Sequence, residues 1–514
     1  MRTTRFNRPA ATAVAATLAA VLLLAGCDST APAGDHADRT ASRQFGDIAF
    51  ASCSLPSVAG GQSTTAQCAT FEVPENRDAP DGRQIALHIA WLPAGGARGG
   101  IGDPVFFLAG GPGQAATEHA ASVDTALREV RKQRDIILID QRGTGDSNPL
   151  DCLDADGKPM STDGLDETSP EALVEFARQC AASLEGRADP RFYTTTEAVQ
   201  DLDAVRIALG VDRINLVGGS YGTRVAQQYA MRYPQHTRSL VLDGVAPNAL
   251  VVGGEFAHTL EDALALQSAQ CQRLPACQAR YPTDMRAQLR KVMLDLQASP
   301  VEVEYRDPGT GESRLDTVTA DTVTGLAFVF SYAPQTAALL PLVIDEAAHG
   351  RYAPLMSLSQ LMARSVGEQM TRGMQWSVLC AEDAERFRAP ADADTTILGA
   401  ELAQMFFAPC AVWPRGKRPA DFNAPFKSDL PVLLLSGELD PVTPPRYGEQ
   451  VLQNLPNGRH LVLDGQGHGA MMLGCMPKLI GQFIETVDAK ALDVECLDTM
   501  TYVPPFTSFN GWEP

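Results

Sequence analysis

The sequence predicts an α/β protein with a mostly parallel central sheet, helices on both faces of that sheet and a mainly helical cap insertion. Short apolar runs rich in Val, Ile and Leu alternate with segments of helical apolar spacing, which is typical of a parallel sheet. The alternation stops near Pro247, and residues 249–378 are mainly helical in their spacing. A helical insertion between two core strands is interpreted as a cap over the carboxyl edge of the sheet, where open α/β sheets bind ligands.

The predicted strands and helices follow from the period of the apolar residues. The strands are Ile85–Leu92, Pro104–Leu108, Asp135–Asp140, Ile214–Val217, Ser239–Asp243, Pro431–Ser436 and His460–Leu463. The helices are Asp201–Leu209 and Thr223–Tyr233 in the core, and Glu261–Gln272, Met285–Gln297 and Thr336–Ala348 in the insertion. One hairpin is expected in the insertion, where Val301–Tyr305 and Arg314–Val318 flank a turn that contains Pro and Gly.

The N-terminus has the pattern of a secretion signal. Three arginines precede an apolar run from Ala10 to Ala25 that is too short for a comfortable membrane span. The run ends in Leu-Ala-Gly-Cys27, which resembles the lipobox of bacterial lipoproteins and implies cleavage before Cys27 and acylation of its thiol. Ordinary signal-peptide cleavage and an anchoring helix are the alternatives. We expect residues 1–26 to be a lipoprotein signal peptide, residues 27–45 a flexible tether, and the protein to be exported, lipid-anchored to a bacterial cell membrane facing the periplasm or exterior, or otherwise secreted.

Composition and charge exclude some partners. The chain of 514 residues has a formal net charge of −20, and removing residues 1–26 takes away three arginines and no acids, which moves the charge to −23. An acidic protein is repelled by nucleic acid and by anionic lipid. We therefore expect no nucleic-acid partner and membrane contact only through a lipid anchor. The oligomeric state is open, with a monomer as the default.

Ten cysteines follow Cys27, an even number that fits disulfides in an oxidising compartment. Connectivity does not follow from sequence, and pairing between near neighbours is the default expectation. Those pairs are Cys53–Cys68, Cys152–Cys180, Cys271–Cys277, Cys380–Cys410 and Cys475–Cys496. Since no pair has the spacing of a zinc site, no structural metal is predicted.

Ser220 is the candidate nucleophile. Gly218-Gly-Ser220-Tyr-Gly222 fits the pattern Gly-x-Ser-x-Gly, in which a serine occupies a strained turn between a strand and a helix. Glycine on either side lets neighbouring backbone pass without a clash at Cβ. Composition alone gives such a pentapeptide roughly once in five chains, so its context decides. An apolar strand leads into the pattern and a helical segment follows it, which favours the nucleophile.

A nucleophilic serine needs an orienting acid and a base, expected later in the chain in that order. Asp440 and His468 each stand just past a predicted strand, and we predict them as the acid and the base. Glu438 is a nearby competitor for the role of the acid. His460 lies at the start of its strand, hence at the wrong end of the sheet. Either predicted residue alone could be an ordinary loop residue, but their order behind Ser220 favours a catalytic triad.

The oxyanion hole is expected to combine the backbone amides of Tyr221, directly after the nucleophile, and of Gly111 in the loop from Ala109 to Gly113. The segment from Gly111 to Ala116 also matches the dinucleotide pattern Gly-x-Gly-x-x-Ala. However, Pro112 removes an amide where phosphate oxygens need one, and an exported protein rarely meets NAD. We therefore expect no cofactor.

Together these motifs resemble the prolyl iminopeptidase and tripeptidyl aminopeptidase family of α/β-hydrolases, most closely its secreted bacterial branch with a C-terminal domain of tripeptidyl-aminopeptidase type. The matching motifs are Gly110-Gly-Pro-Gly113, Asp140-Gln-Arg-Gly-Thr-Gly-Asp-Ser147, Gly218-Gly-Ser-Tyr-Gly-Thr223, the Asp440 loop and Gly467-His-Gly469. Ala109 departs from the family, whose members often carry His there. We expect an α/β-hydrolase core in two parts, residues 46–248 and 379–514, around a cap of residues 249–378.

The resemblance implies a serine hydrolase that cleaves residues from the N-terminus of peptides through an acyl-enzyme, an aminopeptidase of the prolyl or tripeptidyl type. Such an enzyme needs a buried negative group for the substrate's α-ammonium, and Glu382 and Asp383 are the candidates. Capping of the following helix by two surface acids is the alternative. The same triad would serve a carboxylesterase or amidase acting on small esters or amides. A binding lipoprotein without turnover is a further alternative, against which the intact triad argues.

Overall fold

The computed structural model describes residues 42–57, 63–96, 100–161, 169–367 and 370–511. The expected signal peptide, its cleavage site and Cys27 lie outside the described residues. Residues 43–45 form a strand that pairs with residues 48–50, so the expected tether ends before Arg43 rather than at residue 45.

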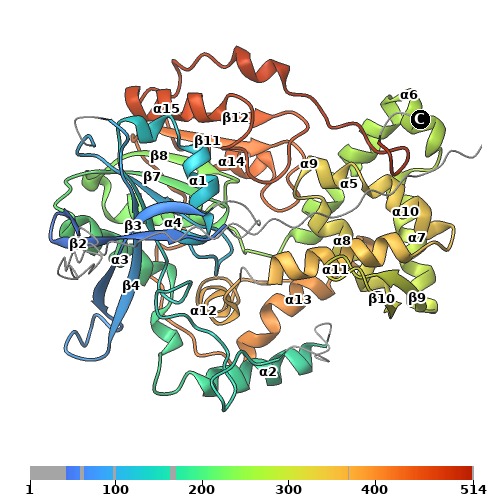
Figure 1. Cartoon of the computed structure of the whole chain (residues 1–514), viewed down its shortest axis with the longest axis horizontal. Helices are drawn as coiled ribbons and strands as arrows, with labels where there is room; N and C mark the ends of the chain where they lie inside the picture. The colour runs from blue at the N-terminus through green and yellow to red at the C-terminus, as the bar shows by residue number, and fades with distance from the viewer. Residues whose placement is uncertain (1–41, 58–62, 97–99, 162–168, 368–369, 512–514) are drawn as a thin grey trace, which may run out of the picture. The chain divides into compact units, whose positions relative to one another are not determined.

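A ten-stranded sheet runs through the core (Figure 1), in the order β1-β2-β3-β4-β6-β5-β7-β8-β11-β12. The pairings from β6 to β12 are parallel, and those from β1 to β6 are antiparallel. The strands are β1 (Arg43–Phe45), β2 (Ile48–Leu55), β3 (Thr64–Pro74), β4 (Gln84–Leu92), β5 (Val105–Leu108), β6 (Ile136–Ile139), β7 (Ile214–Gly219), β8 (Thr237–Asp243), β11 (Val432–Gly437) and β12 (Gly458–Leu463). The predicted α/β fold is confirmed, with a larger antiparallel part than the apolar runs indicated.

Helices cover both faces of the parallel part, which explains why β5 and β6 are apolar at every position. One hydrophobic core joins Leu216 of β7 to α3 and α4, and a second joins Val217 to α1 and α15 on the opposite face. The core helices are α1 (Ala120–Ala126), α2 (Pro170–Ser183), α3 (Thr195–Ala208), α4 (Tyr221–Arg232), α12 (Arg372–Glu382), α13 (Glu401–Phe407), α14 (Pro445–Leu452) and α15 (Met476–Thr486).

The insertion between β8 and β11 has its own hydrophobic core, to which Leu264, Leu289 and Leu326 belong. It contains a β-hairpin at the predicted place, paired from Val301–Val318 to Arg306–Ser313. Its elements are α5 (Phe256–Arg273), α6 (Pro275–Arg280), α7 (Met285–Ala298), β9 (Val301–Arg306), β10 (Ser313–Val318), α8 (Ala320–Phe330), α9 (Pro334–Ala337), α10 (Leu340–Ala348) and α11 (Ala353–Gly367). We call residues 249–378 the cap, as in the sequence-based prediction; this range ends within α12, whose last residues belong to the core.

Disulfides join the five near-neighbour cysteine pairs. They are Cys53–Cys68, Cys152–Cys180, Cys271–Cys277, Cys380–Cys410 and Cys475–Cys496. Because such bonds persist in oxidising compartments, they fit an exported protein. Among the residues that the structure describes, no helix has the length and apolar character of a membrane span.

Candidate active site

Ser220 sits at the turn between β7 and α4, with φ of +53° and ψ of −123°. A positive φ is uncommon for a residue with a side chain, so the surrounding contacts must hold it. The Ser220 N–H donates to the carbonyl of Asp243 at 2.8 Å. Its own carbonyl accepts from the N–H of Thr223 at 2.9 Å and from the Thr223 hydroxyl at 2.6 Å. These bonds fix the turn at the carboxyl end of β7.

The glycines around Ser220 are required by close approach of the backbone. A Cβ at Gly222 would lie 2.1 Å from the carbonyl oxygen of Leu108, and one at Gly218 would lie 2.5 Å from the carbonyl oxygen of Gly222. At Gly219 the nearest atom to a Cβ would be 3.8 Å away. A side chain at Gly218 or Gly222 would therefore clash with neighbouring backbone, whereas Gly219 has room for one.

Asp440 and His468 are brought together at the ends of β11 and β12. His468 Nδ1 lies 2.7 Å from Asp440 Oδ2. The other oxygen of Asp440 accepts from the N–H groups of Val442 and Thr443 at 2.9 and 2.8 Å, and the Thr443 hydroxyl donates to Oδ2 at 2.8 Å. His468 and Ser220 line the same cavity. The three residues predicted as a triad thus meet at one edge of the sheet.

Asp440 and His468 each favour the charged form of the other, against the effect of burial. Burial disfavours the charged form of Asp440, but the neighbouring His468 and the N–H donors outweigh it and hold the pKa of Asp440 below its usual value. Burial likewise disfavours protonated His468, yet the attraction of Asp440 raises the pKa of His468 above 6.5. Asp440 is therefore suited to stabilise an imidazolium at His468.

The two competing residues are engaged elsewhere. Glu438 accepts from the Gly465 N–H at 2.9 Å and from the Tyr502 hydroxyl at 2.5 Å, so its carboxylate holds a neighbouring loop. His460 lies 2.9 Å from the Ser436 hydroxyl. Of the two candidate acids, Asp440 is the one that contacts His468.

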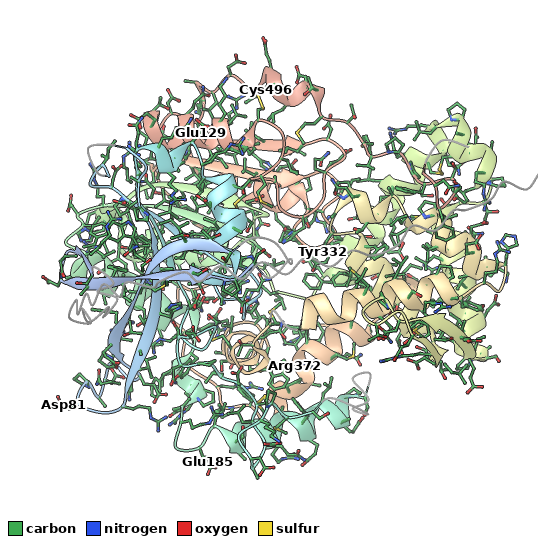
Figure 2. All side chains as sticks on the ribbon, viewed as in Figure 1. Asp81, Glu129, Glu185, Tyr332, Arg372 and Cys496 are labelled. Atoms are coloured by element: carbon green, nitrogen blue, oxygen red, sulfur yellow. A yellow bond between two sulfur atoms is a disulfide. The ribbon has the colours of Figure 1, made fainter. Side chains whose placement is uncertain are left out.

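The cap supplies a contact to His468 that sequence reasoning missed. The His468 N–H donates to the carbonyl of Tyr332 at 2.7 Å, and the two rings meet edge to face with centroids 5.3 Å apart. Figure 2 marks Tyr332, which follows α8. A Cβ at Gly467 would lie 2.2 Å from the Tyr332 carbonyl oxygen, and one at Gly244 would lie 3.0 Å from His468 Cε1. Both glycines make room for these contacts, but no local motif marks Gly244 or Tyr332.

The loop after His468 is fastened from β8. Asp243 is buried, and its carboxylate accepts from the N–H of Ala470 at 2.8 Å and of Met471 at 2.9 Å. Burial raises the pKa of Asp243 above its usual value. Asp243 was also missed, since an aspartate at the end of a strand is not distinctive.

The predicted oxyanion donors lie at a cavity of about 330 Å³ between core and cap, which Gly111, Ser220 and Tyr221 line together. Tyr221 is the first residue of α4, where an amide has no carbonyl partner within the helix. The remaining wall is mostly apolar and aromatic: Ala246, Leu250, Val252, Phe256, Phe328, Tyr332, Met370, Leu379, Phe406 and Val442, with polar Gln375 and Thr443. Among its described lining residues, Arg372, labelled in Figure 2, is the one charged side chain.

Glu382 and Asp383 are not brought to this cavity. Both are buried, and Asp383 bonds to Arg224 at 3.0 Å and to Arg386 at 2.6 Å. Glu382 accepts from the Thr195 N–H at 2.8 Å and from its hydroxyl at 3.0 Å, and burial raises its pKa to about 7. Asp383 is therefore bonded to α4 and Glu382 to the first turn of α3, and neither carboxylate lines the cavity at Ser220. Sequence could not reveal this, because Arg224 lies far away in the chain.

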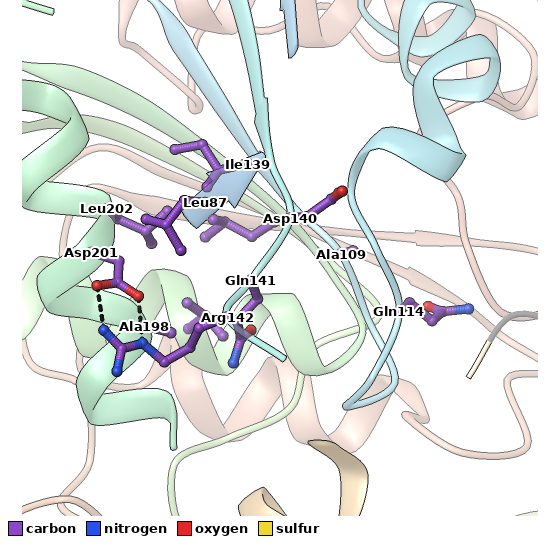
Figure 3. Close-up of a pocket in the computed structure, with 12 residues that line it drawn as sticks. Leu87, Ala109, Gln114, Ile139, Asp140, Gln141, Arg142, Ala198, Asp201 and Leu202 are labelled. Carbon is purple, nitrogen blue, oxygen red and sulfur yellow. Dashed lines mark hydrogen bonds and ion pairs between the residues drawn. The ribbon is translucent and has the colours of Figure 1, made fainter. Parts of the chain in front are cut away.

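Figure 3 shows the segment that begins at Asp140, with Arg142 paired to Asp201 of α3. Arg142 makes two bonds to Asp201, at 2.6 and 2.7 Å, and Gln141 donates to the hydroxyl of Tyr221 at 3.2 Å. The cavity drawn there is only about 20 Å³, enough for a water molecule. We interpret this segment as structural. Within the described parts of the chain, no cluster of His, Cys, Asp or Glu is arranged to hold a metal ion.

Comparisons with known proteins match the chain to two families and to several hydrolases. A family described as alpha/beta hydrolase fold matches residues 103–325, and a family described as TAP-like protein matches residues 395–496. The chain is 27% identical over 450 residues to serine protease Hip1 of Mycobacterium tuberculosis, covering 82% of this chain and 85% of the relative. It is 25% identical over 489 residues to a tripeptidyl aminopeptidase of Streptomyces coelicolor, covering 85% and 84%. Carboxylesterase B of Mycobacterium tuberculosis is 32% identical over 226 residues, which cover 41% of this chain and 43% of that protein.

Proposed function

Because this chain belongs to the α/β-hydrolases and carries a TAP-like region near its C-terminus, we propose that it is a serine peptidase that releases residues from the N-terminus of peptides through an acyl-enzyme. The observation that carries the proposal is the hydrogen-bonded pair of Asp440 and His468 beside Ser220 on its strained turn. Relatives named serine protease and tripeptidyl aminopeptidase align over more than four fifths of the chain and support the peptidase reading.

In the acylation step, Ser220 Oγ attacks the scissile carbonyl while His468 takes its proton. Asp440, kept ionised by its donors and by His468, stabilises the imidazolium that forms. The amides of Gly111 and Tyr221 donate to the oxygen that becomes negative in the tetrahedral intermediate. His468 then gives the proton to the leaving amine nitrogen, and the carbon–nitrogen bond breaks. Water attacks the resulting ester by the reverse sequence, and Ser220 regains its proton.

The cap cavity is the candidate site for the acyl portion of the substrate. It contains the oxyanion donors, and its wall is apolar and aromatic, so burial of an apolar side chain there is favourable. Since the described lining contains no carboxylate, the cavity offers no obvious partner for an α-ammonium group. Dependence on a free N-terminus therefore has a test of its own.

A fluorophosphonate probe tests the serine-hydrolase chemistry. The wild-type protein should be labelled, and Ser220→Ala should not. Ser54→Ala, at an exposed position of β2, is the matched control and should label like the wild type. Absence of wild-type labelling, or labelling that persists in Ser220→Ala, would contradict the proposed nucleophile.

Paired substrates test the peptidase specificity. Peptidyl anilides with a free and an acetylated N-terminus should differ strongly in kcat/KM, with the free amine preferred. A carboxylesterase or amidase is the second candidate, favoured by the similarity to carboxylesterase B over 226 residues. Equal kcat/KM for the two anilides, together with faster cleavage of small esters, would favour this second candidate.

The location of the enzyme is a separate part of the proposal. We expect acylation of Cys27 after removal of residues 1–26, because Leu24-Ala-Gly-Cys27 has the lipobox pattern. Cys27→Ser should abolish incorporation of labelled fatty acid and release the protein from membranes. A processed Cys27→Ser protein that stays on the membrane would contradict the lipid anchor.

A further inference from the structure

Two cavities meet at Ser220. The cap cavity holds the oxyanion donors Gly111 and Tyr221, and a second cavity of about 300 Å³ holds His468, Gly110 and Gln114. Among the residues that the structure describes, Ser220 is the one that lines both. Ser220 therefore lies between the two cavities, whose other lining residues differ.

The chemistry of the reaction assigns the two sides. The leaving nitrogen must receive its proton from His468, so the leaving part of the substrate passes through the space that His468 lines. The oxyanion must point at the donors in the cap cavity, where the acyl part has its apolar wall. The second cavity is thus on the leaving side of the scissile bond.

Among the polar side chains of this cavity, that of Gln114 lies beside the nucleophile. A Cβ built on Gly110 would lie 3.0 Å from Gln114 Oε1 and 3.1 Å from the Cβ of Ser220, so the amide and the nucleophile flank the same point. The Gln114 side chain makes no hydrogen bond with another residue of the described chain. In Figure 3 it points away from the paired Arg142 and Asp201. An amide side chain can both donate to and accept from a peptide group.

Beside the polar residues His119, Ser122 and Asp243, apolar side chains form much of the rest of the leaving-side cavity. Phe107 and Val123 form buried parts of its wall, and Met471 and Met472 lie on the loop after His468. Met472 keeps 48% of its surface exposed, so its side chain is accessible to a ligand in this cavity. Methionine adapts its shape to varied apolar partners, so this wall fits an apolar side chain on the leaving residue.

We propose that this cavity binds the first residue of the leaving peptide, and that the side-chain amide of Gln114 hydrogen-bonds to that residue's main chain. The inference rests on the proposed serine-hydrolase chemistry and deepens it. It also predicts that the same site accepts an amine that attacks the acyl-enzyme. In that transfer the amine nitrogen bonds to the acyl carbon and the ester bond to Ser220 Oγ breaks. The proton from the amine passes through His468 to Ser220 Oγ.

Partition of the acyl-enzyme measures this site directly. An activated p-nitrophenyl ester with an apolar acyl group forms the acyl-enzyme, and either water or an added amine then captures it. Leucinamide carries an apolar side chain and a main-chain amide, whereas 3-methylbutylamine has the same side chain without the amide. Because both products come from one intermediate, their ratio is independent of how much enzyme is folded or how fast it acylates.

Capture by leucinamide should saturate with concentration in the wild type. Gln114→Leu should lower the ratio of leucinamide capture to hydrolysis about tenfold, the size of one lost hydrogen bond, and should leave the ratio for 3-methylbutylamine within about twofold. Gln133→Leu is the matched control. Gln133 is exposed and precedes the amino end of β6, whereas the site lies at the carboxyl ends of the parallel strands. It should keep both wild-type ratios.

Two results would overturn the inference: capture that rises linearly with leucinamide and never saturates, or a Gln114→Leu change that is equal for both amines. The ester donor separates this test from that of the peptidase proposal. An enzyme that cleaves no peptide would still form the acyl-enzyme from the ester and reveal the leaving-side site.

Discussion

Substituting Gly467 by alanine tests whether the cap carbonyl of Tyr332 positions His468, the proposed catalytic base. The new Cβ would lie 2.2 Å from that oxygen, whereas real Cβ contacts under 3.0 Å essentially never occur. The loop and the cap must therefore move apart by about 1 Å, which takes the 2.7 Å bond from His468 N–H to Tyr332 out of hydrogen-bond range. Gly467 is not at a positive φ, so the effect comes from this contact and not from backbone strain.

Misplacement of a catalytic group by about 1 Å costs on the order of 10²-fold in rate. We expect Gly467→Ala to lower kcat/KM for an activated ester by about that factor, and to lower the free energy of unfolding by about 1–3 kcal/mol, as overpacking does. Active-site titration with a fluorophosphonate counts competent enzyme, and urea unfolding measures the loss of stability. The rate per titrated site is then free of the folding effect.

Gly325→Ala is the matched control in the cap. Gly325 lies within α8, the helix that leads to Tyr332, and a Cβ there meets no atom within 4 Å. Alanine in a helix interior stabilises by about 0.5–1 kcal/mol relative to glycine, so this variant should be slightly more stable and fully active. If Gly467→Ala keeps kcat/KM per titrated site within about threefold of the wild type, the cap carbonyl does not position His468.

Three further outcomes follow from the triad and from the buried carboxylates. Asp440→Asn should lower kcat about 10⁴-fold, because an amide neither stabilises the imidazolium of His468 nor holds its neutral ring in the required tautomer. Glu438→Gln should change kcat little, and steady-state assays of both variants compare the two acids. The profile of kcat/KM against pH should fall on the acid side with a midpoint above 6.5, since the base must be neutral and Asp440 raises the pKa of His468; a midpoint below 6.5 would contradict this coupling. The raised pKa of Glu382, about 7, means that its contribution to stability is full below its unfolded pKa and is lost as pH rises through 7. Glu382→Gln can keep the bond from the Thr195 N–H at its oxygen, while its amide nitrogen donates to the Thr195 hydroxyl. The variant should gain up to about 3 kcal/mol on the wild type between pH 4.5 and 8 in urea unfolding, and a gap that does not widen with pH would refute the shift.

The parallel half of the sheet could be predicted because its strands are buried on both faces. Strands such as β5 and β6 consist of apolar residues alone, so their runs stand out in the sequence. The antiparallel strands β2 and β3 were missed for the opposite reason. They mix exposed and buried positions and carry small or polar residues, so they present no continuous apolar run.

At the candidate site, prediction from sequence depended on whether a residue's role has a local signal. Motif and chain order predicted Ser220, Asp440 and His468 as one group, and the structure brings them together, because the geometry of an elbow and of two strand ends is encoded locally. Glu382 and Asp383 could not be judged from local sequence, since their partner Arg224 belongs to α4, more than one hundred residues earlier. Their environment depends on how separate segments pack, and local patterns carry no information on that packing.

The cap has a second role beyond enclosing the substrate. Three strand ends place Ser220, Asp440 and His468, but the backbone N–H of His468 is satisfied by Tyr332, which belongs to the cap. An edge-to-face contact links Tyr332 to Phe328, and Phe328 in turn packs against Phe256. These three aromatic residues also line the cavity proposed for the acyl group. An acyl group that packs on this wall therefore touches the same side chains that hold the base, so acyl-side substitutions should change kcat as well as KM.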